Sequence, residues 1–105
     1  MLGEFEQLVL LAVLRVGDDA YGAPVLDEIA THAGRAPSLA TVHATLDRLD
    51  AKGFLTSRIG DPTPTRGGRR KRLYAITPTG RAAVREAVGA IARMARGLSL
   101  GWDAP

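Results

Sequence analysis

The chain has no cysteine among its 105 residues. Disulfide bonds and thiolate metal sites are therefore excluded, and their absence fits a reducing compartment. The chain also has no long hydrophobic run, since the apolar stretch from Leu8 to Leu14 is too short to cross a bilayer. This stretch follows Glu4 and Glu6 instead of the basic segment that opens a signal peptide. We therefore expect a cytoplasmic protein with no membrane partner.

The signatures of common catalytic sites are missing as well. There is no nucleophile elbow, no phosphate-binding loop and no pair of carboxylates placed against a histidine. Glu28 and His32 share one face of a predicted helix, but no third metal ligand accompanies them. We therefore predict that the protein is not an enzyme and has neither a cofactor nor a metal site.

What the chain does have is a strongly uneven distribution of charge. The formal net charge is only +3, and the 46% hydrophobic and 24% charged content is typical of one globular domain. Residues 58–72 carry six basic side chains against one acidic, whereas residues 1–33 carry six acidic side chains against one basic. This separation favours a polyanion on one face of the molecule.

The apolar periodicity and the capping residues predict four helices and one hairpin. The predicted helices span residues 3–16, 22–33 and 38–52, and a fourth begins at residue 78. Gly22 is the predicted N-cap of the second helix, and Gly53 is the predicted left-handed residue after the third. The predicted strands span residues 54–59 and 71–76. This order is that of a winged helix-turn-helix domain. The fold class predicted is mainly α with a small β-hairpin, with residues 1–77 as the winged helix-turn-helix domain and 78–105 as a C-terminal dimerisation helix and tail.

The helix over residues 38–52 is the predicted recognition helix. Leu39, Val42, Leu46 and Leu49 fall on one side and predict its core face. The opposite side is mostly small, which allows close approach to base edges in the major groove. For His43, both packing against the core and a phosphate contact stay open. The predicted DNA contacts of this helix are Ser38, Ala40, Thr41, His43, Ala44, Thr45 and Arg48.

The hairpin over residues 60–72 is the predicted wing. Two glycines permit a tight turn, and the cations that follow supply the charge that phosphate contacts need. By itself such a run is also typical of a solvated or targeting-type patch. We expect the wing to supply affinity and register, while the recognition helix chooses the sequence. The predicted wing contacts are Arg66, Gly67, Gly68, Arg69, Arg70, Lys71 and Arg72.

The first and last helices carry more apolar surface than one small core needs. The first is apolar almost all round, and the last has apolar residues at alternating spacings of four and three, which is typical of a helix–helix seam. Packing on the chain's own domain is the alternative. The predicted dimer interface consists of Phe5, Leu8, Leu11, Val84, Val88, Ile91, Ala95 and Leu98.

Several short motifs in a fixed order resemble the PadR family of transcriptional regulators. They are Leu2-Gly3-Glu4-Phe5-Glu6-Gln7, Ala20-Tyr21-Gly22, Thr45-Leu46-Asp47-Arg48-Leu49, Lys52-Gly53, Gly67-Gly68-Arg69-Arg70-Lys71-Arg72, Tyr74 and Thr77-Pro78-Thr79-Gly80. The resemblance covers nearly the whole chain. It implies a homodimeric winged-helix protein, usually a repressor, in which the N-terminal and C-terminal helices form the dimer.

The chain departs from this family in two respects. His43 stands where the family commonly has a tyrosine, and one C-terminal helix replaces the larger helical domain of longer members. A small-molecule effector is then expected at the dimer interface. Trp102 is a candidate effector contact, and a loosely ordered terminus is the alternative for it.

Together these observations predict a regulator that binds double-stranded DNA at a palindromic operator. The recognition helix enters the major groove, and the wing lies on the backbone. The alternative is a winged-helix interaction module in which the basic hairpin holds an acidic protein partner.

Overall fold

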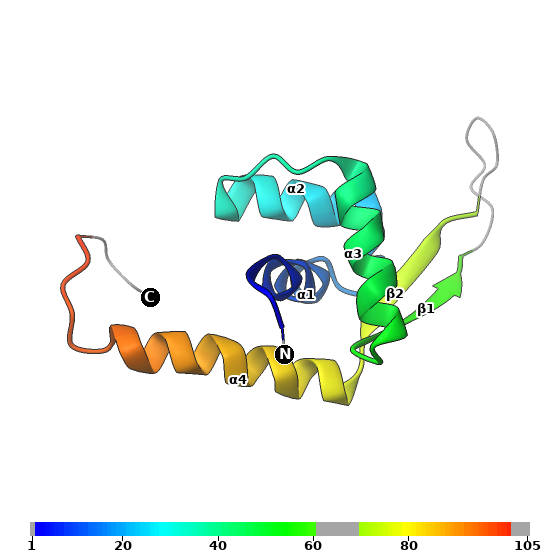
Figure 1. Ribbon diagram of the computed structural model, residues 1–105. Coiled ribbons are helices and arrows are strands. Elements are labelled where there is room, and N and C mark those ends of the chain that lie inside the picture. The colour runs from blue at the N-terminus through cyan, green and yellow to red at the C-terminus, as the bar shows by residue number, and fades with distance from the viewer. Residues whose placement is uncertain (1, 61–69, 102–105) are drawn as a thin grey trace.

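The computed structural model describes residues 2–60 and 70–101. Its elements, in chain order, are α1 (Glu4–Val16), α2 (Gly22–Ala33), α3 (Leu39–Ala51), β1 (Leu55–Ile59), β2 (Arg72–Ile76) and α4 (Pro78–Ala95). The chain is therefore mainly helical with one antiparallel hairpin, and it has the predicted winged helix-turn-helix fold (Figure 1). None of the helices in the described ranges is long and apolar enough to span a membrane.

Polar caps fix the starts of the third and fourth helices. The Ser38 hydroxyl accepts the Thr41 amide hydrogen bond at 3.1 Å, and the Thr77 hydroxyl accepts that of Gly80 at 3.0 Å. Both bonds satisfy amides that have no partner within the helix. Gly53, with φ +81°, takes the left-handed conformation after α3, as predicted.

Most boundaries lie within one residue of the prediction, and two of the differences affect packing. The N-cap of α2 is Tyr21, and Gly22 is the first helical residue. Gly22 leaves room for the ring of His43, because a Cβ there would lie 2.7 Å from Nε2 of His43. The fourth helix ends at Ala95, before the predicted seam residue Leu98, and Gly97 follows at φ +83°.

The core surrounds α1, which contacts α2, α3, α4 and β2. Figure 1 shows α1 near the centre, between α2 and the first half of α4, while the second half of α4 extends past it. The apolar character of α1 is thus largely explained by packing within one chain. The predicted core face of α3 is correct except for Leu39, which lies in the first turn and is 43% exposed.

The hairpin is anchored to the rest of the domain through the middle of β2. Leu55 pairs with Ile76 at the end nearer to α3 and α4, and Ile59 pairs with Arg72 at the other end. The Tyr74 amide donates to the Ala20 carbonyl at 2.8 Å, and this bond joins β2 to the turn that precedes α2. The two strands extend away from the helices (Figure 1).

Candidate nucleic-acid interface

Most of the exposed side chains in the first two turns of α3 are small. Ala40, Thr41 and Ala44 are exposed, while Val42, Leu46 and Leu49 are buried. The Thr41 hydroxyl lies 2.9 Å from the hydroxyl of the N-cap Ser38. The first two turns of α3 therefore present a mostly uncharged surface of short side chains, which a ligand can approach closely.

His43 lies beside this face and is exposed. Its ring packs against Gly22, so it contacts the start of α2 at the same time. The ring therefore packs on the start of α2 and is accessible to solvent, and its contact with a phosphate stays a prediction.

Thr45 was predicted to contact DNA, but its side chain is buried. Its side chain is 1% exposed, and its hydroxyl donates to the Thr41 carbonyl at 2.9 Å. The reason is helical geometry, because Thr45 follows Val42 by three residues and precedes Leu49 by four, so it shares their side. The predicted contact of Thr45 with DNA is therefore replaced by a structural role in the core.

Arg48 is exposed, but its guanidinium is directed to α1. Nε of Arg48 donates to Oε2 of Glu6 at 3.2 Å, and Nζ of Lys52 donates to the same oxygen at 2.8 Å. The hydrogen bond from Lys52, then those from the Gly3 amide and Arg48, lower the pKa of Glu6 to about 2 against the opposing effect of burial. The carboxylate is therefore ionised at neutral pH.

The sequence alone did not indicate the role of Glu6. Its spacing from Gly3 could have indicated one of its bonds, because the Gly3 amide donates to Oε1 of Glu6 at 2.9 Å in the manner of a capping box. Its two basic partners lie more than 40 residues further along the chain, and no local pattern indicates such a pair.

Two hydroxyl–carboxylate hydrogen bonds join α3 to the hairpin. Tyr74 donates to Oδ1 of Asp47 at 2.8 Å, and Ser57 donates to Oδ2 of Asp50 at 2.6 Å. Burial, together with the nearby Asp47, raises the pKa of Tyr74 well above its usual range. The hairpin and α3 are therefore held in one fixed relation.

Part of the predicted wing lies in the described chain. Arg70 is exposed, Nζ of Lys71 lies 4.7 Å from the centroid of the Tyr21 ring, and Arg72 donates to the Ser57 hydroxyl at 3.0 Å. Lys71 thus contacts the start of α2, and Arg72 contacts the neighbouring strand, both at the loop end of the hairpin. Arg66, Gly67, Gly68 and Arg69, as well as Trp102, lie outside the described residues.

The predicted dimer residues fall into two groups. Val84 is 3% exposed and packs in the chain's own core, which corrects its assignment to a dimer seam. Phe5, Leu8 and Leu11 pack partly against that core, and Ala95 is half-buried. Exposed apolar side chains gather on the second half of α4 and just beyond it: Val88, Ile91, Met94, Leu98 and Leu100. Met94 and Leu100 were not predicted.

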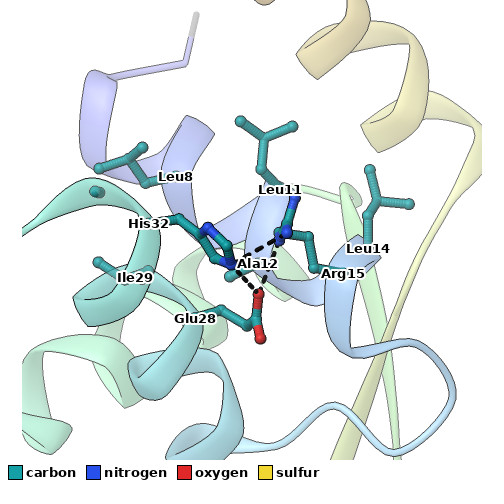
Figure 2. Close-up of a pocket in the computed structure, with 9 residues that line it drawn as sticks. Leu8, Leu11, Ala12, Leu14, Arg15, Glu28, Ile29 and His32 are labelled. Atoms are coloured by element: carbon teal, nitrogen blue, oxygen red, sulfur yellow. Dashed lines mark hydrogen bonds and ion pairs between the residues drawn. The ribbon is translucent and has the colours of Figure 1, made fainter. Parts of the chain in front are cut away.

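An open cavity of about 420 Å³ lies between α1 and α2 (Figure 2). Leu8, Leu11 and Ile29 contribute to its apolar lining. At its rim, Oε1 of Glu28 accepts a hydrogen bond from Arg15 at 2.8 Å and lies 3.4 Å from Nε2 of His32. The described residues contain no cluster of three or more metal-ligating His, Asp or Glu side chains.

Comparison with known proteins identifies relatives of this chain. Residues 10–86 match the model of the transcriptional regulator PadR-like family. The chain is 38% identical over 81 residues to the transcriptional regulator Rv3488 of Mycobacterium tuberculosis, and the match covers 75% of this chain and 69% of that protein.

Solved structures show the same fold. A transcriptional regulator from Clostridium thermocellum superposes with a TM-score of 0.70 at 19% identity, covering 87% of this chain and 85% of that one. Bacillus subtilis PadR, crystallised in complex with operator DNA, superposes with a TM-score of 0.64 at 18% identity, covering 91% of this chain and 61% of that one.

Proposed function

The chain belongs to the PadR-like family of transcriptional regulators, and from this premise we propose that it binds double-stranded operator DNA as a homodimeric repressor. The observation that carries the proposal is the small outward face of α3, formed by Ala40, Thr41 and Ala44 beside a basic hairpin. The complex of Bacillus subtilis PadR with operator DNA, which has a similar fold, supports it.

We assign sequence reading to the first two turns of α3. Thr41 and Ala44 carry methyl groups that can contact the methyl group of thymine, and their small size lets the helix backbone approach the bases. His43, exposed at the edge of this face, is placed to contact a phosphate. Ser38 caps the helix and so fixes the direction in which it enters the groove.

The hairpin supplies the phosphate contacts in this proposal. Arg70, Lys71 and Arg72 continue a basic run that begins at Arg66, and each cation that neutralises a phosphate releases counterions. Such contacts position the protein without reading the sequence. The wing is therefore expected to strengthen binding to all duplexes alike.

Dimerisation is assigned to the exposed apolar end of α4. Ile91 and Met94 are 63% and 80% exposed, and a group of exposed apolar side chains such as this one is typical of a surface that another protein covers. We propose that the partner's α1 and α2 cover them. Residues 1–33 are acidic, whereas α4 carries Arg81, Arg85 and Arg93 against Glu86, so the two surfaces are complementary in charge.

A dimer of this kind gives regulation a simple mechanism. Two recognition helices must match half-sites about 34 Å apart, or a multiple of that distance, on a palindromic operator. A small-molecule effector at the interface, for which Trp102 stays a candidate contact, would change their separation or tilt. Both half-sites would then be mismatched at once.

The test is to select the preferred duplex from random sequences and to measure its affinity at several salt concentrations. With about six phosphate contacts, affinity should fall roughly 10³-fold between 50 and 200 mM salt. The triple substitution R70Q/K71Q/R72Q should weaken selected and random duplexes equally. No preference for any duplex, with tight binding to an acidic protein instead, would overturn the proposal.

The dimer is tested separately by sedimentation of the I91D/M94D variant. A shift from dimer to monomer at micromolar concentration is expected, with helical content retained because neither side chain belongs to the core. A wild-type chain that sediments as a monomer at that concentration would refute this part.

A further inference from the structure

One buried carboxylate links α1 to the helix that we propose reads DNA. Glu6 is 7% exposed, and its Oε2 accepts hydrogen bonds from both Arg48 and Lys52. Its Oε1 is occupied by the Gly3 amide. The single negative charge of Glu6 thus binds both Arg48 of α3 and Lys52, the C-cap of that helix.

Arg48 and Lys52 are placed where DNA phosphate could also reach them. Their side chains are 52% and 39% exposed, so they lie at the surface. The Arg48 guanidinium is nevertheless directed inward, since Nη2 lies 3.4 Å from the buried Thr45 hydroxyl and Nε binds Glu6. A phosphate would have to compete with a carboxylate that is itself removed from water, where ionic attraction is stronger than in bulk solvent.

We propose that Glu6 limits the affinity of α3 for DNA phosphate by holding Arg48 and Lys52 against α1. This inference rests on the proposed DNA binding. A cation that already neutralises a carboxylate releases fewer counterions when it meets a phosphate. Glu6 therefore lowers the sequence-independent part of binding and leaves the contacts of Thr41 and Ala44 to decide which duplex is preferred.

The substitution Glu6→Gln tests this directly. Glutamine keeps an oxygen for the Gly3 amide and loses the charge that holds Arg48 and Lys52. The full chain is titrated with a random-sequence duplex and with the selected operator between 50 and 200 mM salt. We expect E6Q to bind the random duplex more tightly at 50 mM salt, with an advantage over wild type that shrinks about 3- to 10-fold by 200 mM as one or two additional phosphates are neutralised.

Asp19→Asn is the matched control. Asp19 is exposed in the turn between α1 and α2, and its substitution changes the net charge by the same amount. Its salt dependence should equal that of wild type. The triple variant E6Q/R48Q/K52Q should lose the additional salt dependence of E6Q. An E6Q chain with the salt dependence of D19N, or a weaker one, would overturn the inference.

A second variant serves if E6Q does not fold. In R48Q/K52Q with Glu6 intact, the salt dependence should stay close to that of wild type, because the two cations are already withheld. A clear decrease in salt dependence, by the amount expected for two lost phosphate contacts, would show that they bind DNA and would refute the inference. A wild-type chain that binds no duplex would refute the proposed function, and this inference with it.

Discussion

The two halves of α3 have opposite surroundings. The first half, around Thr41 and Ala44, presents small exposed side chains and is held mainly by its cap and by α2. The second half is joined to three other elements through the side chains of Asp47, Arg48 and Asp50. One half of the helix is therefore free to meet a ligand, while the other fixes the helix in the domain.

This difference indicates which end of the helix can enter a groove. Asp47 and Asp50 would repel DNA phosphate, and both accept hydrogen bonds from hydroxyls of the hairpin. The first half carries no acidic residue. Recognition helices of helix-turn-helix proteins contact bases through their N-terminal residues, and the charge distribution of α3 favours the same orientation.

The largest effect is expected for Leu46→Ala in the middle of the helix. Leu46 is fully buried, and its truncation should lower the free energy of unfolding by about 2–5 kcal/mol. Ala44→Ser, two residues away on the exposed face, should change it by less than about 0.5 kcal/mol. Chemical denaturation measures both. Equal losses of unfolding free energy in the two variants would contradict the assignment of one face of α3 to the core and the other to solvent.

The hydrogen bonds from Arg48 and Lys52 to Glu6 join α3 to α1, and this anchor predicts a loss of stability in acid. Because the pKa of Glu6 is lowered from 4.5 to about 2 in the folded chain, its contribution is fully present above pH 4.5. It should be lost as the pH falls from 4.5 to about 2. The difference in unfolding free energy between wild type and E6Q should therefore shrink over this range, and a constant difference would contradict the anchor.

A smaller effect is expected where the hairpin meets α3. Tyr74→Phe removes the hydrogen bond to Asp47 and should cost about 1 kcal/mol of unfolding free energy. Tyr21→Phe is the control, because it keeps the ring on which Lys71 lies and should leave stability unchanged. Thermal unfolding measures both. A loss in Y21F as large as in Y74F would argue against this anchor.

The smallest change in stability is expected in the first half of the helix. Thr41→Ala should alter the unfolding free energy by less than about 0.5 kcal/mol. It should still reduce the preference for the selected operator over single-base variants, as measured by competition binding. Thr56→Ala, at an exposed position of β1, should change neither quantity. Unchanged preference in T41A would mean that this half does not read the sequence.

Much of the fold could be predicted because its signals are local. Ser38 and Thr77 begin helices through bonds to residues three positions later, and the apolar period placed Val42, Leu46 and Leu49 in the core. The seam predicted on α4 was less accurate. The same period that suggests a partner also suits the chain's own core, and Val84 belongs to the core.

The candidate site was harder to predict because its key contacts are distant in sequence. The exposed positions of Ala40, Thr41 and Ala44 follow from the helical period alone. The inward direction of Arg48 depends on its hydrogen bond to Glu6. Asp47 is held by a hydrogen bond from Tyr74, which is 27 residues away. Periodicity shows which side of a helix a residue occupies and gives no information about such partners.

Gly22 and His43 occupy a single shared volume. A Cβ at position 22 would lie within 2.8 Å of two atoms at the tip of the imidazole ring, so any side chain there would force the ring into another position. Related chains that keep a ring in this position on α3 should therefore keep glycine at the position of Gly22. The start of α2 thus sets the orientation of an exposed side chain on α3.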